Sequence, residues 1–286
     1  MLKVTIAKPA SLKDLYKTLA RTPGPRKFLA GGTDLCVSAR HGAGVPCNWL
    51  DISDIPELQA VKISGKTIQL GSARRLHDLE NSPLVQRWLP ALHKAMPHFA
   101  SPPLRQMATL GGNCANASPS ADGVCALCAE GAKAVIRHPN GKQTLLPVEK
   151  LFTGPKKTIL KQDELIVRFE IPKTGHRGSY QKLGARRALA ISKIALAATA
   201  WLDGNIITDI RIFLGAVGPT VLRACKTEAA LRGSALGSEK SLRQAAELIA
   251  SECSPIDDQR STARYRRAMS PVLLERALAE LREERL

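Results

Sequence analysis

The 286-residue sequence contains few aromatic side chains and no long hydrophobic run. Aromatic residues make up 4% of the chain, which leaves little for stacking nucleic-acid bases, and no zinc-finger or RRM pattern is present. The longest apolar stretches, such as residues 194–202, fall far short of the ~20 residues that span a bilayer. We therefore expect neither specific nucleic-acid recognition nor a membrane span.

Signals for secretion and for a disulfide framework are also missing. Only a few apolar residues precede Lys8 and Pro9, so the start of the sequence lacks the apolar segment of a secretory signal. The seven cysteines are an odd number at irregular spacing, in a chain long enough to bury a core without cross-links. We therefore expect a cytoplasmic protein whose cysteines are mostly reduced.

The sequence does carry a formal net charge of +17, from 42 Lys and Arg against 25 Asp and Glu. The excess is spread almost evenly, at +10 over residues 1–172 and +7 over residues 173–286. Such a charge suits an acidic protein partner, an anionic surface or a polyanion. Because there is no basic tail, we expect the charge to serve protein partners, and a basic polyanion-binding protein stays an alternative.

The local patterns predict three parts, of which the first is a small α/β lobe over residues 1–56. A helix is expected after Ser11, where apolar residues recur at helical spacing, and short apolar runs predict strands at residues 27–30 and 48–52. The change from this alternation to hairpins sets the end of the lobe near Pro56.

Residues 57–172 are the second lobe in this division, and residues 173–286 are a C-terminal domain. The turn at Asn140-Gly141 is among the strongest hairpin signals. The second lobe is expected to contain hairpins at 60–71 and 132–146, a helical stretch at 76–96 broken at Pro83, and a strand at 165–171. The C-terminal domain is expected to contain an antiparallel meander at 178–183, 194–202 and 206–216, then helices at 227–231, 239–252 and 261–284.

Two segments have the glycine and hydroxyl composition of a phosphate-binding loop. Residues 29–35 run from a strand through Gly31-Gly32 toward a helix, and residues 109–113 repeat the double glycine. Without a Cβ atom, backbone N–H groups can approach an anion closely, and a helix N-terminus adds favourable partial charge. Either double glycine alone could equally form a tight turn. Neither matches the G-x-G-x-x-G or P-loop pattern, which disfavours a nicotinamide-type Rossmann domain and an NTPase.

The two segments extend into longer motifs, A-G-G-T-D-L from Ala30 and T-L-G-G-N-x-x-N-A-S-P-S-A-D from Thr109. Further motifs occur at residues 101–105, 152–155, 163–172, 180–187 and 214–219. Together they resemble the FAD-binding medium subunit of the molybdenum hydroxylases, the family of xanthine dehydrogenase and carbon monoxide dehydrogenase. The resemblance covers nearly the whole chain.

The resemblance implies an α+β protein with an FAD-binding fold of the vanillyl-alcohol-oxidase (PCMH) type. In it, the small N-terminal α/β lobe and the mixed second lobe hold FAD, and an α+β C-terminal domain with an antiparallel sheet and helices covers it. Residues 28–35 would wrap the pyrophosphate, although Asp34 could also cap the next helix. Asp122 would accept a hydrogen bond from the adenosine or ribityl hydroxyls.

Three further positions carry over from the resemblance. Phe99 would lie near the cofactor, Ile166 would meet the flavin through its backbone, and Lys182 would place a cation near the ring or its phosphates. The complete set of implied FAD-binding residues is Phe28, Leu29, Ala30, Gly31, Gly32, Thr33, Asp34, Leu35, Phe99, Thr109, Gly111, Gly112, Asn113, Asp122, Ile166 and Lys182.

The function that the resemblance implies is electron transfer within a molybdenum hydroxylase complex. Non-covalent FAD would take electrons from a small subunit with 2Fe-2S clusters, while a large molybdopterin-binding subunit oxidises the substrate. The subunits are expected to form a dimer of heterotrimers, and an external acceptor such as NAD would receive the electrons. Because the chemistry belongs to the cofactor, no catalytic residue is expected on this chain.

Other interpretations of single features stay open. Cys125 and Cys128 form a C-x-x-C pair near Cys114, but a local fourth ligand is missing, so we expect packed thiols and no metal. The six histidines are scattered and suggest no catalytic base. A stand-alone FAD oxidoreductase is a second alternative, although neither a separate substrate domain nor an attachment histidine is apparent.

Overall fold

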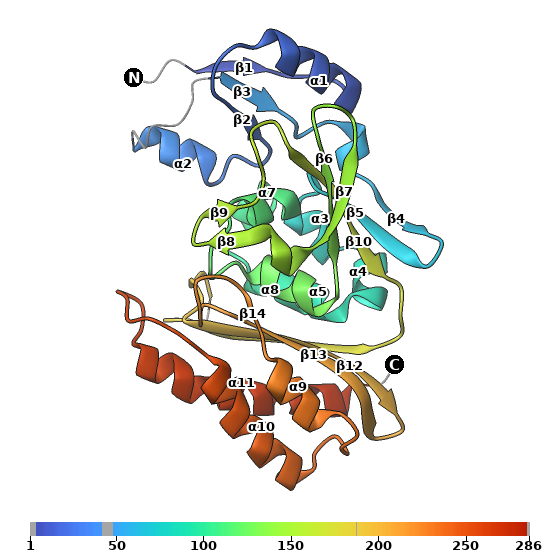
Figure 1. Ribbon diagram of the computed structural model, residues 1–286, viewed down its shortest axis with the longest axis vertical. Helices are drawn as coiled ribbons and strands as arrows, with labels where there is room; N and C mark the ends of the chain where they lie inside the picture. The colour runs from blue at the N-terminus through green and yellow to red at the C-terminus, as the bar shows by residue number, and fades with distance from the viewer. Residues whose placement is uncertain (1–3, 42–47, 187, 285–286) are drawn as a thin grey trace.

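The computed structural model describes residues 4–41, 48–186 and 188–284. Its three larger sheets follow one another along the long axis of the molecule (Figure 1). The sheet of the N-terminal lobe lies at the top of this view, the sheet of the second lobe in the middle, and the C-terminal sheet below, with the last helices beneath it. The expected α+β class is confirmed.

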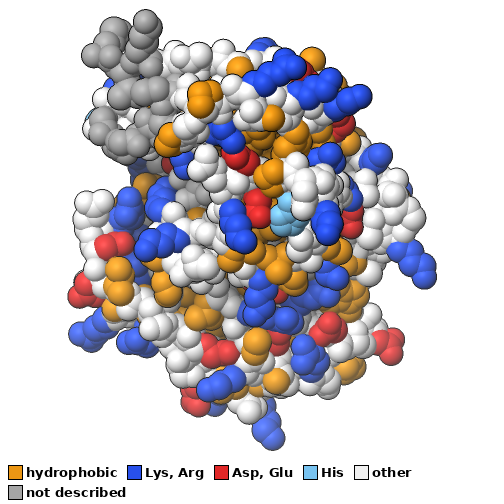
Figure 2. Space-filling view, turned by 45° about the horizontal axis from the view of Figure 1, so that its top comes forward, with side chains coloured by type: hydrophobic (Ala, Val, Ile, Leu, Met, Phe, Trp, Pro, Cys, Tyr) orange, Lys and Arg blue, Asp and Glu red, His pale blue; other side chains and the backbone are white. Residues whose placement is uncertain are grey.

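Basic side chains are dispersed over the face of the molecule shown in Figure 2. Figure 2 shows Lys and Arg side chains interspersed with acidic, polar and apolar ones over the visible face. Some of them form exposed ion pairs, such as Lys8 with Asp54 at 2.6 Å and Arg232 with Asp209 at 2.7 Å. The face in view therefore carries no single basic tract.

The N-terminal sheet is parallel, with the strand order β1-β3-β2. Its strands are β1 (Thr5–Ala7), β2 (Arg26–Leu29) and β3 (Asn48–Asp51), and its helices are α1 (Leu12–Arg21) and α2 (Leu35–Arg40). As predicted, Ser11 caps α1, its hydroxyl accepting a hydrogen bond from the Asp14 N–H at 3.1 Å. Leu15 and Leu50 belong to a hydrophobic cluster that continues into the second lobe, so the boundary near residue 56 stays a prediction.

The second lobe is built on an antiparallel sheet with the order β4-β5-β10-β6-β7. The strands are β4 (Val61–Ser64), β5 (Thr67–Gly71), β6 (Lys133–Arg137), β7 (Gln143–Pro147) and β10 (Leu165–Pro172), with a small pair β8 (Phe152–Gly154) and β9 (Lys157–Thr158) beside them. Both predicted hairpins, β4-β5 and β6-β7, are present, and β10 lies between them.

Six α-helices and three short 3-10 helices complete this lobe. They are η1 (Pro56–Leu58), α3 (Leu76–Glu80), α4 (Pro83–Trp88), α5 (Pro90–Ala95), η2 (Met96–His98), α6 (Pro102–Arg105), α7 (Leu110–Ala115), α8 (Asp122–Ala129) and η3 (Val148–Leu151). The helical stretch predicted at residues 76–96 was expected to break at Pro83 alone, but it also breaks at Pro90. Each proline begins a new helix, where the missing N–H costs no hydrogen bond.

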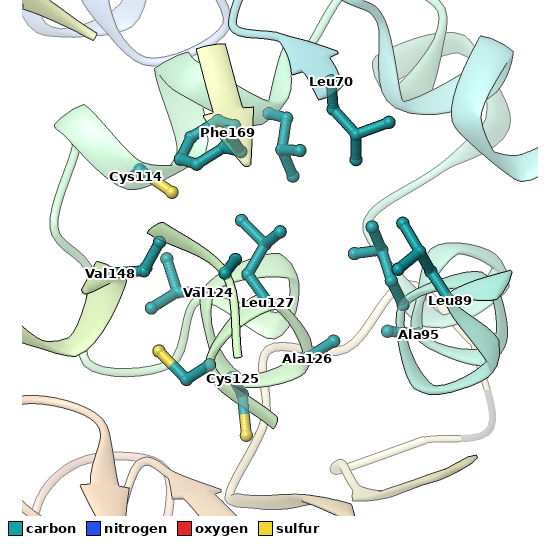
Figure 3. Close-up of a cluster of buried hydrophobic side chains, with 14 of the residues drawn as sticks. Leu70, Leu89, Ala95, Cys114, Val124, Cys125, Ala126, Leu127, Val148 and Phe169 are labelled. Carbon is teal, nitrogen blue, oxygen red and sulfur yellow. The ribbon is translucent and has the colours of Figure 1, made fainter. Parts of the chain in front are cut away.

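The core of the second lobe forms where α5 and α8 pack against the sheet. Figure 3 shows Leu127 of α8 among side chains from β5, β10 and α5. Cys114, Cys125 and Cys128 are buried in the same cluster as free thiols. Burial raises the pKa of Cys114 and Cys125, so these thiols are unreactive core residues.

The C-terminal sheet has the order β11-β12-β13-β14. Its two faces are buried in two different hydrophobic clusters. Its strands are β11 (Arg177–Leu183), β12 (Ile194–Asp203), β13 (Ile206–Gly215) and β14 (Leu222–Arg223), and the helices are α9 (Cys225–Leu231), α10 (Glu239–Glu252) and α11 (Ala263–Glu283). The predicted meander and three helices are confirmed. Along β12, Ala195 and Ala197 join the core under α8, whereas Leu196 and Ala198 join the core of the C-terminal helices. The sheet thus lies between α5 and α8 on one side and α9 to α11 on the other (Figure 1).

A buried polar pair connects the second lobe to the start of this sheet. His176 Nε2 lies 2.7 Å from Glu130 Oε2, at the end of α8. The other Glu130 oxygen accepts hydrogen bonds from the N–H groups of Ala91 and Leu92 in the first turn of α5, where a carboxylate is favoured. These contacts hold the segment between β10 and β11 against the second lobe. Because this segment is shared in this way, the predicted domain boundary at residue 172 stays a prediction.

Candidate functional site

The first double glycine forms a turn whose backbone N–H groups are unpaired. β2 ends at Leu29, α2 begins at Leu35, and Gly32 between them has a φ of +70°, which glycine adopts without strain. Within the part of the chain that the structure describes, the N–H groups of residues 31–35 donate no hydrogen bond. Successive free N–H groups in such a turn form a concave site for an anion.

The second double glycine lies in a helix and not in the loop that the sequence predicted. Gly111 and Gly112 are in the first turn of α7, and Thr109 caps it, accepting a hydrogen bond from the Gly112 N–H at 3.1 Å. A Cβ atom on Gly111 would lie 2.7 Å from the Ser72 carbonyl oxygen, so close packing requires glycine there. Gly112 is exposed, and a Cβ atom there would come close only to Thr109 Oγ1, at 2.9 Å. Gly112 therefore leaves space beside the helix.

The two glycine segments lie against each other. A Cβ atom on Gly31 would be 2.1 Å from the Met107 carbonyl oxygen, immediately before the segment that caps α7. Beyond α7, Asn116 Nδ2 donates to Asp34 Oδ1 at 2.8 Å, and Lys156 Nζ lies 3.7 Å from the same carboxylate oxygen. Asp34 is the N-cap residue of α2, as expected, but its carboxylate makes no cap hydrogen bond and is held by Asn116 instead.

A cavity opens on each side of α7. Cavity A, of about 430 Å³, lies between the N-terminal lobe and the second lobe. Cavity B, of about 1060 Å³, is lined by the second lobe and the C-terminal domain, together with Asp34 of the N-terminal lobe. Small-molecule sites occupy roughly 300–1,000 Å³, so both cavities have the size of a ligand site.

Cavity B combines apolar walls with polar groups. Phe99, Leu104 and Ile191 contribute apolar surface, while Asn113 and Asp122 contribute polar atoms. Leu104 and Ile191 are 43% and 52% exposed, and together they present apolar surface to the cavity. The mixture suits a flat, mainly apolar ring that carries polar substituents.

Strained backbone gathers at the two cavities. The non-glycine residues with positive φ in the described part of the chain are Ala100, Ala117, Lys156, Asp163, Leu189 and Ala216. All except Ala117 line one of the cavities, and Ala117 lies between two residues that line cavity B. Such conformations cost about 1–3 kcal/mol each and cluster at functional sites. This clustering supports a ligand-binding site at the two cavities, independently of the glycine motifs.

A carboxylate held by three donors borders cavity B. Asp122, the first residue of α8, accepts hydrogen bonds from the Tyr180 and Ser192 hydroxyls at 2.6 Å each. Its other oxygen accepts from Lys182 Nζ at 2.7 Å, and this ammonium also donates to the His98 carbonyl at 2.8 Å. Burial, reinforced by the charge of Asp122, raises the pKa of Tyr180 well above its usual value, so Tyr180 stays a donor.

The structure places most of the expected site residues around one region. Cavity A is lined by Phe28, Ala30, Gly111, Gly112 and Ile166, and cavity B by Asp34, Phe99, Asn113 and Asp122. The turn and the helix cap between the cavities contain Leu29, Gly31, Gly32, Thr33, Leu35 and Thr109. Lys182 lies behind Asp122 and lines neither cavity. Ile166 is therefore on the opposite side of α7 from Phe99 and Asp122.

The sequence did not identify Ser72, Tyr180 or Ser192 as site residues. The Ser72 hydroxyl is buried without a partner at cavity A, as is the side-chain oxygen Oδ1 of Asn113 at cavity B, and a ligand could satisfy either atom. Tyr180 was detectable, because it lies two residues before Lys182 on β11 and so faces the same side of the sheet. Ser192 carries no such signal.

The described part of the chain offers no cluster of candidate metal ligands, because no group of three His, Cys, Asp or Glu side chains is arranged there to hold a metal ion. None of the described helices is both long and apolar enough to cross a membrane.

Comparisons with known proteins agree with one another. Residues 2–174 match the family described as FAD binding domain in molybdopterin dehydrogenase, and residues 179–281 match the CO dehydrogenase flavoprotein C-terminal domain. The sequence is 32% identical to the carbon monoxide dehydrogenase medium chain of Hydrogenophaga pseudoflava, over 94% of each chain. It is 30% identical to the xanthine dehydrogenase FAD-binding subunit of Escherichia coli O157:H7, over 95% of this chain and 93% of the relative.

A solved structure resembles the whole fold. It is carbon monoxide dehydrogenase from Hydrogenophaga pseudoflava, in a form that lacks the Mo-pyranopterin moiety of the molybdenum cofactor. The TM-score is 0.92 at 31% sequence identity, and the match covers 98% of this chain and 97% of the other. The arrangement of both lobes and the C-terminal domain is thus common to the two proteins.

Proposed function

Because the chain belongs to the family of FAD-binding subunits of molybdenum hydroxylases, we propose that it is the electron-transfer flavoprotein of such an oxidoreductase complex. The unpaired N–H groups of residues 31–35 are the observation that supports FAD most directly. A pyrophosphate is an anion that such a turn can bind, and the space beside Gly112 lets it approach α7.

The two cavities suit the two ends of FAD. Cavity A would take the adenosine, and the larger cavity B, with its apolar walls, would take the flavin and ribityl chain. In this arrangement Asp122 would meet the ribityl or flavin end. Ile166 would meet the adenosine end, which differs from the flavin contact that the resemblance implies.

Bound FAD would supply the exchange of single electrons on one side and of an electron pair on the other. The chain's own residues would bind and orient it: the turn at residues 31–35 would hold the phosphates, and Phe99 and Ile191 would shield the ring from water. Asp122 offers its remaining acceptor position to a hydroxyl of the cofactor. We assign proton transfer to none of these residues.

The proposed partners are a small subunit with 2Fe-2S clusters and a large molybdopterin-binding subunit, in a dimer of heterotrimers located in the cytoplasm. An external acceptor such as NAD would receive the electrons. Relatives with 32% and 30% identity are named for carbon monoxide and xanthine dehydrogenases. Since two relatives of this chain are named for enzymes with different substrates, we assign substrate choice to the large subunit.

FAD binding to the purified chain tests the central proposal. We expect yellow protein that releases intact FAD on acid precipitation, and an apoprotein that binds added FAD in a calorimetric titration. A folded, colourless protein without affinity for FAD would contradict the proposal.

Copurification distinguishes the alternatives. Two partner subunits bound to the yellow chain would support the complex, whereas yellow protein alone that turns over a substrate with oxygen would support a stand-alone oxidoreductase. Tightly bound nucleic acid on a colourless chain would support the polyanion-binding alternative.

A further inference from the structure

Two hydroxyl groups without a role in the proposed function donate to the same carboxylate oxygen. Tyr180 Oη and Ser192 Oγ each lie 2.6 Å from Asp122 Oδ1. Distances this short are typical of strong hydrogen bonds from a hydroxyl to a charged oxygen. Lys182 Nζ donates to the other Asp122 oxygen at 2.7 Å. All three donors therefore belong to the part of the chain that follows β10.

The network is buried, but Asp122 and Ser192 reach cavity B. Tyr180, Asp122 and Ser192 are 3%, 6% and 1% exposed. Asp122 and Ser192 line the cavity, whereas Tyr180 and Lys182 do not. A carboxylate has about four acceptor positions, and three donors occupy this one. The direction and the effective charge of the remaining position therefore depend on those donors.

We propose that Tyr180 and Ser192 are positioning residues that set the reduction potential of bound FAD through Asp122. Their hydrogen bonds fix the orientation of the carboxylate and offset part of its negative charge at the cavity. The proposal rests on the proposed function, because the group affected is the flavin end of FAD in cavity B.

The expected direction follows from electrostatics. The Tyr180 hydroxyl is one of the donors that offset the negative charge of the Asp122 carboxylate, so losing it leaves more of that charge facing cavity B. Negative charge in a buried site disfavours the further negative charge that reduction brings to the flavin. If Tyr180→Phe weakens the binding of reduced FAD tenfold more than that of oxidised FAD, the potential falls by about 30 mV.

The experiment measures the midpoint potential of FAD bound to the full chain by equilibration with redox dyes. The variants are Tyr180→Phe and Ser192→Ala, each of which removes one hydroxyl. Tyr16→Phe is the matched control, because the Tyr16 hydroxyl donates to the Arg137 carbonyl at 3.2 Å and its residue lines neither cavity. We expect both variants to show a lower midpoint potential than the wild type. For Tyr180→Phe the expected shift corresponds to reduced FAD losing tenfold more affinity than oxidised FAD. The control should have the wild-type potential.

Asp122→Asn separates positioning from a purely structural role. Without the charged oxygen, adding Tyr180→Phe should no longer change the potential, since the two effects act through one group. A Tyr180→Phe protein that binds FAD with the wild-type potential would overturn the proposal, as would an equal shift in both backgrounds.

If Tyr180→Phe does not fold, Ser192→Ala tests the proposal in its place, because it removes the second hydroxyl donor to Asp122 with little change in volume. A wild-type chain that binds no FAD would overturn the proposed function and this inference together. A chain that binds FAD normally, with potentials unaffected by either hydroxyl, would overturn this inference alone.

Discussion

Gly31 and Gly112 serve different purposes at one site. A Cβ atom on Gly31 would lie 2.1 Å from the Met107 carbonyl, so this glycine permits two backbone segments to touch. A Cβ atom on Gly112 would come close only to Thr109 Oγ1, at 2.9 Å, so the space beside this glycine is otherwise free. The motifs led to both glycines, but spacing in a sequence does not reveal which backbone lies opposite each one.

Substitutions at these glycines should separate folding from binding. Gly112→Val should keep the fold and greatly weaken FAD binding, because its side chain fills the space that the phosphates need. Gly31→Ala should instead lower the free energy of unfolding by about 1–3 kcal/mol, as overpacking does. Gly175→Ala is the control, since nothing lies within 4 Å of a Cβ atom there and its φ is not positive. Denaturant unfolding measures the effect on stability, and FAD titration measures the effect on binding. If a folded Gly112→Val protein bound FAD with unchanged affinity, Gly112 would be only a residue of the first turn of α7 and not part of the phosphate site.

At the scale of helices and strands, strong periodicity was a reliable guide. The amphipathic α1, both hairpins and the C-terminal meander followed from their patterns. Helix α7 did not, because its two glycines and an asparagine disfavour helix, and contacts of Leu110 and Gly111 with the segment after β5 stabilise it. The positive φ of Leu189 was equally unexpected, because leucine rarely adopts this backbone conformation.

An ion pair between the loop before α11 and this helix should make the stability of the protein fall as the pH becomes acidic. A hydrogen bond from Arg266 at 2.6 Å is the main cause that lowers the pKa of Asp258 to about 2. A lowered carboxyl pKa contributes stability above the unfolded value of ~3.9, and the contribution is lost as the pH falls through the folded value. Asp258→Asn should therefore melt below the wild type at pH 7, and the gap should close between pH ~4 and pH ~2. Melting curves across this range check it, and a constant gap would contradict this origin.

At the scale of the whole molecule, the basic excess is the most general property. The net charge is +17, and the face in Figure 2 shows it dispersed among other side chains. A dispersed field guides a partner of opposite charge over long distances, whereas a packed apolar contact holds the complex together. The charge therefore suits assembly with acidic partner subunits.

Association with the partner subunits should consequently slow as salt is added. Screening shortens the range of the field to about 8 Å at physiological ionic strength. Dissociation should change much less, because subunit interfaces of ~1,600 Å² or more retain an apolar centre. Stopped-flow association at low and high salt, beside a DNA-binding control, measures this. A rate that ignores salt, together with tight DNA binding at physiological ionic strength, would assign the charge to polyanions instead.

The C-terminal sheet, buried on both faces, makes the two matched sequence regions a single cooperative unit. Ala197 and Phe213 belong to the core that α8 completes, while neighbouring residues of the same strands belong to the core of α10 and α11. Neither region can melt without opening the other's interior to water. Heating should thus produce one calorimetric transition rather than two, and the wall of cavity B should persist until the entire chain unfolds.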